Sequence, residues 1–152
     1  SRVVLLKEFT ENGFVFFTNY EGNKSKAIAP NAKVALLFFW QGQARQVRIT
    51  GVAEKIDSSA SDDYFYSRPV ESRIGAWASP QSQPIETYDI LAQRFDAFKK
   101  QFGENIPRPP HWGGFVVKPD TFEFWQGRPS RLHDRLFYTQ QNNEWKMERL
   151  AP

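Results

Sequence analysis

Short runs of apolar residues, or of alternating apolar and polar residues, occupy the first and last thirds of the chain, and this pattern predicts β-strands. We expect strands at residues 2–7, 14–19, 34–40, 45–56, 112–118, 121–126, 132–139 and 144–150. The run at 34–40 is apolar throughout, so that strand is expected to be buried. Glu11-Asn12-Gly13 contains an Asn-Gly hairpin signal. Gly51 predicts a bulge, and Pro119-Asp120 predicts a break between two strands.

The middle third has a helical period instead. Apolar residues spaced by three and four fall on one helix face at Tyr88, Leu91, Phe95, Phe98 and Phe102. Gly103 follows where a helix commonly ends. We expect this aromatic stripe to pack in the core.

Shorter helical segments are expected at residues 23–29, 58–68 and 70–78. Strands, then helices, then strands again indicate an α+β fold, and we expect a mostly antiparallel barrel with helices packed outside. No internal repeat or long linker divides the sequence, so we expect a single domain over residues 1–152.

Composition excludes several kinds of site. The 152 residues contain no Cys, which excludes disulfides, thiolate metal sites and cysteine nucleophiles, and only two His, so we expect no metal. The longest apolar run, residues 34–40, is far shorter than the roughly 20 residues that a membrane span needs. No secretion signal opens the chain, and we expect a cytoplasmic protein. The net charge of +3 suits a small phosphorylated ligand as well as it suits nucleic acid.

The most distinctive polar segment is Arg131-Leu-His-Asp-Arg135. On a strand, Arg131, His133 and Arg135 would share one cationic face. Such a face is unfavourable unless an anion or neighbouring Asp and Glu side chains balance it, and the segment alone leaves both alternatives open.

A second candidate set lies in the helical region. Tyr64, Arg68 and Ser72 are spaced by four residues, which places them on one helix face if the helix continues through Pro69. Two hydroxyls and a guanidinium suit a phosphate, although coincidence of spacing explains the pattern nearly as well.

The chain resembles the pyridoxamine/pyridoxine 5′-phosphate oxidase family from one end to the other. The motifs that carry the resemblance are Arg2-Val-Val-Leu-Leu-Lys7, Phe17-Thr-Asn19, Arg45-Gln-Val47, Tyr64-Phe-Tyr-Ser-Arg-Pro69, Ser72-x-Ile-Gly-Ala76, Gln81-Ser82, Trp112-Gly-Gly114, Glu123-Phe-Trp-Gln-Gly127, Arg131-Leu-His-Asp-Arg135 and Glu148-Arg-Leu-Ala-Pro152. The resemblance implies an FMN-binding split β-barrel that forms a homodimer with FMN at the interface. It also implies oxidation of pyridoxine or pyridoxamine 5′-phosphate to pyridoxal 5′-phosphate, with O₂ reduced to H₂O₂.

The resemblance also implies the site residues. FMN would be bound by Arg2, Val3, Val4, Leu5, Leu6, Lys7, Phe17, Thr18, Asn23, Lys24, Gln46, Gln81, Ser82, Trp125 and Arg135. The substrate would be bound by Lys7, Tyr64, Arg68, Ser72, Arg131, Leu132 and His133. Arg131 and His133 would be the catalytic residues of this set.

Two departures from the family pattern affect these expectations. Family members usually have Arg-Lys where this chain has Asn23-Lys24, so one guanidinium for the FMN phosphate is replaced. We also expect the family's N-terminal helix, first strand and lid segment, which precede Arg2, to be absent here. The alternative hypotheses are a flavin- or pyridoxal-phosphate-binding protein without oxidase turnover and, with much less support, a nucleic-acid-binding barrel.

Overall fold

The computed structural model describes residues 1–142 and 144–152. Its residue contacts divide the chain into two compact units. The first unit consists of Ser1–Asn31 and Glu54–Val116, and the second consists of Ala32–Ala53 and Val117–Pro152. The longest strand, β5 (Trp112–Gln126), contributes its first part to one unit and its second part to the other.

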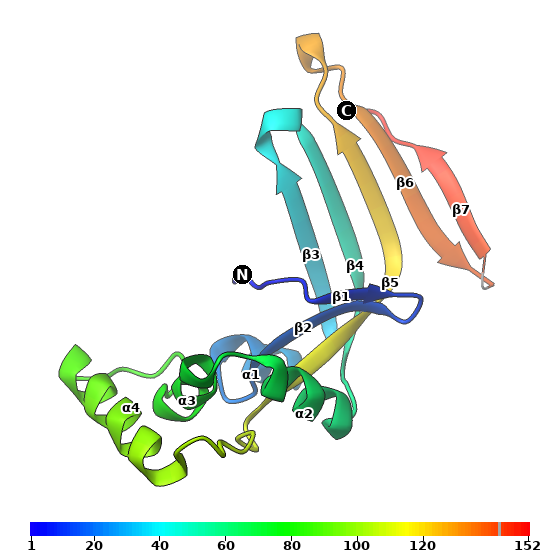
Figure 1. The fold of residues 1–152 in the computed structure, drawn as a ribbon. Coiled ribbons are helices and arrows are strands. Elements are labelled where there is room, and N and C mark those ends of the chain that lie inside the picture. Colours follow the sequence, from blue (N-terminus) through cyan, green and yellow to red (C-terminus); the bar gives the residue numbers. More distant parts are fainter. Residues whose placement is uncertain (143) are drawn as a thin grey trace. The chain divides into compact units, whose positions relative to one another are not determined.

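The first unit contains the strands β1 (Glu8–Thr10) and β2 (Gly13–Asn19) together with the helices of the chain (Figure 1). These helices are α1 (Asn23–Ile28), α2 (Ser58–Ser67), α3 (Val70–Ala78) and α4 (Tyr88–Phe102). β1 and β2 form the predicted hairpin, with Thr10 paired to Gly13. The positive φ of 127° at Gly13 is a conformation that glycine adopts without strain.

The core of the first unit is built from aromatic and branched side chains. Phe65, Ile74, Ile106 and Trp112 are buried together. Phe95, Phe98 and Phe102 of α4 pack against them, which confirms the prediction for these three residues of the stripe. The prediction is wrong for Tyr88, the first residue of α4, whose side chain is 78% exposed.

The second unit is an antiparallel sheet. It contains β3 (Lys33–Trp40), all but the last two residues of β4 (Arg45–Lys55), the second part of β5, β6 (Asp134–Gln141) and β7 (Glu144–Arg149). The strands lie in the order β3-β4-β5-β6-β7. Short 3₁₀ turns, η1 (Gln41–Gln43) and η2 (Pro129–Arg131), follow β3 and β5. Within the described residues the strand pairings form an open path, so the sheet is not closed into a complete barrel.

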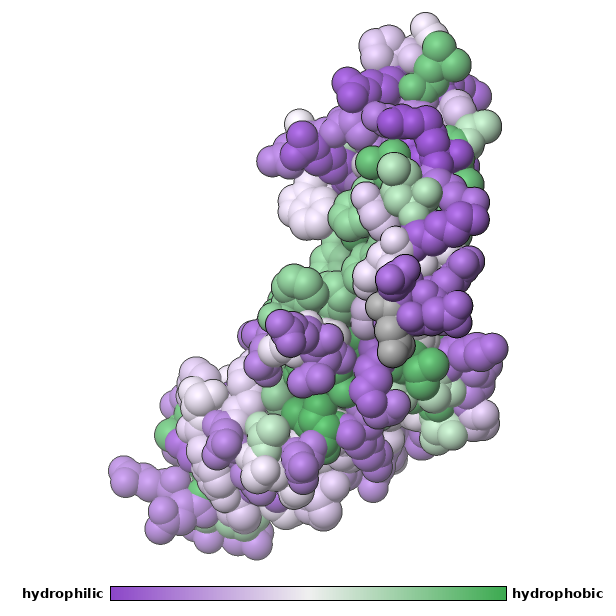
Figure 2. All heavy atoms as spheres, turned by 90° about the vertical axis from the view of Figure 1, so that its right-hand side faces the viewer, coloured by the Kyte–Doolittle hydropathy of each residue, from purple (hydrophilic) through white to green (hydrophobic). Residues whose placement is uncertain are grey.

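Two expectations about the early strands are wrong. Residues 2–7 do not form a strand, because pairing with β2 begins only at Glu8, opposite Val15. The preceding stretch is largely exposed, as shown by Val3 at 98%. β3 exists but is not buried, since every second residue is exposed, including Leu37 at 63% and Phe39 at 59%. Hydrophobic side chains therefore reach the surface of this chain (Figure 2).

The expected strand break is also absent, and the pairing of β4 with β3 has no bulge at Gly51. These two strands pair residue for residue through Gly51. Pro119-Asp120 lies inside the continuous strand β5. A side chain at Gly51 would place its Cβ 2.1 Å from the carbonyl oxygen of Lys118. Gly51 is therefore needed because the backbone of β5 passes close to β4 just before its proline.

Candidate functional site

A pocket of about 480 Å³ in the first unit is lined by most of the predicted FMN- and substrate-binding residues that belong to that unit. Those that line it are Val3, Val4, Leu5, Lys7, Phe17, Thr18, Lys24, Tyr64, Arg68, Ser72 and Gln81. Arg2, Leu6, Asn23 and Ser82 belong to the same unit but are not among the lining residues. Three lining residues were not predicted, namely Asn19, Pro69 and Trp112.

One wall of this pocket is a polar cluster from three separate segments. The Lys24 ammonium donates to Thr18 Oγ1 at 2.6 Å and to Gln81 Oε1 at 2.9 Å. Gly22 makes room for the amide, because a Cβ there would lie 2.6 Å from Gln81 Oε1. Burial, and then the nearby charge of Arg2, lower the pKa of Lys24. An ammonium whose charge is disfavoured in this way gains from a bound anion.

A second part of the pocket lining is aromatic and cationic. The Phe17 ring stacks on Tyr64 at 3.9 Å and on Trp112 at 5.5 Å between centroids. The Arg68 guanidinium lies 4.7 Å from the Trp112 ring centroid, and the Lys7 ammonium lies 5.6 Å from that of Tyr64. Flat rings flanked by cations suit an aromatic ligand that carries a phosphate.

Arg68 has an unused donor. Its Nη1 atom is buried without a hydrogen-bond partner among the described residues, and burial lowers the pKa of the guanidinium. A buried unpaired donor of this kind is costly unless a ligand satisfies it. The condition for a shared helix face, a helix that continues through Pro69, is not met, because α2 ends at Ser67 as expected from the proline. Tyr64, Arg68 and Ser72 nevertheless line one pocket.

The second unit holds the remaining predicted residues. A pocket of about 290 Å³ there brings together Gln46 of β4 and Trp125 of β5. The predicted residue Arg135 lies on β6 directly across from Trp125. Much of the remaining lining is apolar and was not predicted, for example Trp40, Phe124 and Leu136.

An acidic residue outside the predicted set organises the cations of this sheet. Glu123 Oε1 accepts from Arg135 Nε at 3.0 Å, and its Oε2 accepts from Arg48 Nη2 at 2.7 Å. The hydrogen bond to Glu123 raises the pKa of Arg135. Of the two alternatives that the sequence left open, pairing with an acidic neighbour is therefore the one seen for Arg135.

The prediction that Arg131, His133 and Arg135 share a strand face is wrong. β6 begins only at Asp134, and Arg131 lies in η2 with a φ of 60°. Pro129, followed by two residues with positive φ, turns the chain here, so a strand cannot pass through it. Leu132 is exposed, and His133 lies beside Trp125 with ring centroids 4.7 Å apart.

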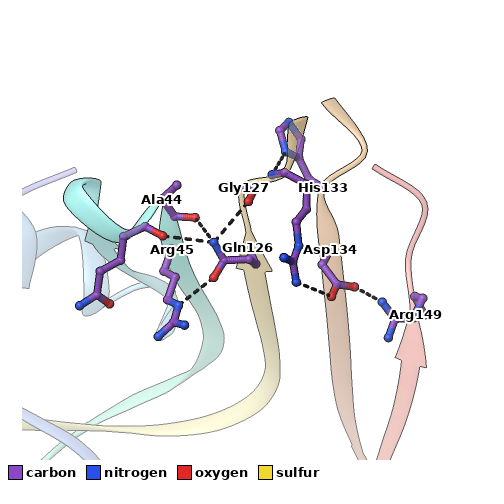
Figure 3. A network of polar contacts seen from close by, with 9 residues as sticks. Ala44, Arg45, Gln126, Gly127, His133, Asp134 and Arg149 are labelled. Atoms are coloured by element: carbon purple, nitrogen blue, oxygen red, sulfur yellow. Dashed lines mark hydrogen bonds and ion pairs between the residues drawn. The ribbon is translucent and has the colours of Figure 1, made fainter. Parts of the chain in front are cut away.

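The His133 ring is also held through one nitrogen. The backbone N–H of Arg128 donates to His133 Nδ1 at 3.2 Å (Figure 3). The neutral imidazole therefore carries its hydrogen on Nε2. Next along the chain, Asp134 binds Arg149 of β7 and lies 3.8 Å from Arg128 Nη2 (Figure 3). These contacts tie the turn that contains Arg131 to the end of the sheet.

Gln126 fixes the other side of the same turn. Its amide nitrogen donates to the carbonyl oxygens of Gln43, Ala44 and Gly127, at 3.1, 3.3 and 3.3 Å. Its Oε1 accepts from Arg45 Nε at 2.8 Å (Figure 3). The start of the turn is thereby linked to the η1 end of β3 and β4.

The described residues contain no group of three or more acidic or histidine side chains that could hold a metal ion. In the same part of the chain, no helix has the length and apolar character required to cross a membrane.

Comparison with solved structures defines the class of fold. The chain is similar to the structure of PhzG from Burkholderia lata in complex with tetrahydrophenazine-1-carboxylic acid, with a TM-score of 0.92, 28% identity and coverage of 99% of this chain and 74% of that one. It also shares its fold with a pyridoxamine 5′-phosphate oxidase-related, FMN-binding protein from Nostoc punctiforme, with a TM-score of 0.76, 17% identity and coverage of 99% and 80%. The fold is therefore that of the FMN-binding split-barrel proteins.

Sequence comparisons identify the family. Residues 2–102 match the model for pyridoxamine 5′-phosphate oxidase, and residues 112–152 match the pyridoxine 5′-phosphate oxidase C-terminal dimerisation region. The chain is 56% identical to pyridoxine/pyridoxamine 5′-phosphate oxidase of Bordetella pertussis and 53% identical to that of Polynucleobacter asymbioticus, in each case over 100% of this chain and 72% of the relative. The chain belongs to the pyridoxine/pyridoxamine 5′-phosphate oxidase family.

Proposed function

We propose that this chain is an FMN-dependent oxidase that converts pyridoxine 5′-phosphate or pyridoxamine 5′-phosphate to pyridoxal 5′-phosphate. The single observation that carries the proposal is the first-unit pocket, where Arg68 has a buried donor without a partner among the residues that the structure describes, beside an aromatic wall. A phosphorylated pyridine offers both an anion and a flat ring. Family membership supports the same substrate class.

The overall reaction balances with O₂ as the electron acceptor. The alcohol substrate and O₂ give pyridoxal 5′-phosphate and H₂O₂, and the amine substrate also consumes water and releases ammonia. When bound, FMN would supply the redox chemistry that joins oxidation of the substrate at C4′ to reduction of O₂.

The FMN-binding residues are proposed from both units. In the first unit Thr18, Lys24 and Gln81 form a preassembled polar cluster that can bind the FMN phosphate. In the second unit Gln46, Trp125 and Arg135 lie on neighbouring strands β4, β5 and β6. The remaining proposed contacts are Arg2, Val3, Val4, Leu5, Leu6, Lys7, Phe17, Asn23 and Ser82.

The substrate-binding residues have distinct proposed roles. Lys7, Tyr64, Arg68 and Ser72 bind the 5′-phosphate, since all four line the first-unit pocket. Arg131 and His133, with Leu132 between them, bind the ring substituents at the 3-oxygen and C4′. Because Nδ1 of His133 accepts from the backbone, its Nε2–H is the group that donates a hydrogen bond to the substrate.

We further propose that the protein is a homodimer with FMN bound at the interface. The matched dimerisation region at residues 112–152 supports dimer formation. The exposed apolar side chains of β3, such as Leu37 and Phe39, supply a surface that association would bury.

The test is turnover of the purified protein reconstituted with FMN. With pyridoxine 5′-phosphate and O₂, we expect equimolar H₂O₂ and pyridoxal 5′-phosphate, the latter followed by its absorbance. Flavin binding with neither product would contradict the oxidase and favour a binding protein without turnover. Absence of flavin fluorescence quenching on titration with FMN would contradict the cofactor itself.

Two variants test the division of the turn and strand between substrate and cofactor. Arg131→Leu is expected to lower kcat/KM by about 10–100-fold with FMN content retained, as for loss of a charge-assisted contact. Arg135→Leu is expected to lower FMN occupancy first, and excess FMN should restore its activity. The reverse outcome, with flavin lost in Arg131→Leu only, would show that the assignment is wrong.

A further inference from the structure

We propose that Glu123 is a positioning residue for FMN, which it affects through Arg135. This inference rests on the proposed function. Glu123 is 3% exposed although it is a carboxylate, and both of its oxygens bind guanidinium groups. A buried acid in the middle of a sheet is costly unless such partners neutralise it. Arg48 and Arg135 come from the two strands on either side, β4 and β6.

The position of Glu123 connects it to the three proposed FMN residues of the second unit. Trp125 lies two residues further along β5 and therefore on the same face of the sheet. By the same rule Arg48 shares its face of β4 with Gln46. Arg135 pairs directly with Trp125 across the strands. The carboxylate thus links β4, β5 and β6 on the face that carries these three side chains.

The contacts of Arg135 show how this positioning would work. Its Nε is held by Glu123 at 3.0 Å, and its Nη1 donates to the carbonyl oxygen of Ala151 at 2.8 Å. These two bonds fix the plane of the guanidinium, and among the hydrogen bonds of the described residues none involves its Nη2 amino group, which we assign to a ligand. A side chain that is already ordered loses less conformational entropy when the ligand binds.

An electrostatic role and a positioning role of Glu123 predict opposite changes in the affinity for FMN when Glu123 is replaced. Two guanidiniums and one carboxylate leave one positive charge in the cluster. Replacing Glu123 with a neutral residue makes the cluster more positive, so a purely electrostatic role predicts tighter binding of anionic FMN. A positioning role predicts weaker binding, because Arg135 loses its fixed orientation.

The experiment measures the FMN dissociation constant of the full chain by quenching of flavin fluorescence. Glu123→Gln keeps the size of the side chain and is expected to weaken FMN binding about tenfold. In the Arg135→Leu background the same substitution is expected to have no further effect on FMN binding. At saturating FMN, kcat of Glu123→Gln is expected to return to near the wild-type value, since the substrate contacts are untouched.

Asp62→Asn is the matched control. Asp62 also forms a carboxylate–guanidinium pair, with Arg108 at 2.6 Å, but lies in the first unit outside the pocket lining. We expect this variant to lower the thermal midpoint while its FMN dissociation constant stays within about twofold of wild type. Glu123→Asp serves if the glutamine variant does not fold, because its shorter side chain keeps the charge but cannot reach both arginines.

Wild-type or tighter FMN binding in Glu123→Gln would overturn the positioning role. Full additivity with Arg135→Leu would also overturn it, because Glu123 would then not act through Arg135. In either case, turnover of substrate by the wild-type protein would still support the proposed oxidase function. If the wild-type chain itself does not bind FMN, the proposed function and this inference both fail.

Discussion

Lys24 is the residue whose ionisation should control the affinity for FMN. It is half-buried against Thr18 and Gln81, and burial together with the charge of Arg2 lowers its pKa. Only the ammonium form attracts a phosphate dianion. A lysine with a lowered pKa loses that form at a lower pH than an ordinary lysine does.

We therefore expect FMN affinity to fall as pH rises through the lowered pKa of Lys24, by about tenfold or more once the charge is lost. Titrations from about pH 7 to pH 10 measure this, with Lys24→Arg as the control that keeps its charge throughout. An identical pH profile for both proteins would contradict the prediction.

The lowered pKa of Lys24 also predicts how the free energy of unfolding of the ligand-free protein changes with pH. Between the lowered pKa of Lys24 in the folded chain and its ordinary value in the unfolded chain, the unfolded state binds more protons. The contribution of Lys24 to the free energy of unfolding therefore rises with pH across that window. Lys24→Arg should lack this rise.

Single residues also show where prediction from the sequence succeeds and where it stops. Arg68 and Ser72 reach the same pocket as Tyr64, although the helical spacing that suggested them is interrupted at Pro69. Glu123 was not predicted as a site residue. A polar residue between two apolar ones, here Phe122 and Phe124, is ordinary in a strand. Its partner Arg48 lies 75 residues away in sequence. Local patterns do not reveal a partner at that separation.

At the scale of elements, boundaries that depend on local chemistry were predictable. α3 has the predicted bounds, and α4 ends before Gly103, whose φ is 55°. Boundaries that depend on a neighbouring strand were not. Residues 2–7 have strand-like composition, but the ladder with β2 begins only at Glu8, and β6 begins at Asp134 instead of at the predicted residue 132. Pairing and turn geometry, and not composition, determine these ends.

Two glycines provide a matched test of packing between elements. Gly51→Ala would put a Cβ 2.1 Å from Lys118 O, so we expect destabilisation of about 1–3 kcal/mol. Gly75 lies within α3 and has no atom within 4 Å of its ideal Cβ, so Gly75→Ala should stabilise by about 0.5–1 kcal/mol. Thermal unfolding measures both changes. A stabilised Gly51→Ala protein would show that the approach of β5 does not constrain this site.

At the scale of the whole molecule, the exposed apolar residues of the second unit require an explanation. Leu37 and Phe39 project from one face of β3 at 63% and 59% exposure, whereas a strand of such composition is ordinarily covered. The sequence correctly indicated an apolar strand but not its exposure, because burial in a partner and burial in a core favour the same residues. The proposed homodimer would cover this face.

A charge on β3 should therefore weaken the dimer. Leu37→Lys would place an ammonium in the proposed interface, beside Arg48 on the paired strand, and we expect the dimer dissociation constant to rise by at least about tenfold. Tyr88→Lys is the control, because Tyr88 is 78% exposed but lies on α4 in the first unit. Light scattering over a dilution series, with FMN present, measures both. We expect wild type and Tyr88→Lys to have twice the 17.7 kDa chain mass at micromolar concentration, and Leu37→Lys to approach the chain mass on dilution. A monomeric wild-type protein would contradict the homodimer, whereas an unchanged dimer in Leu37→Lys would exclude only β3 from its interface.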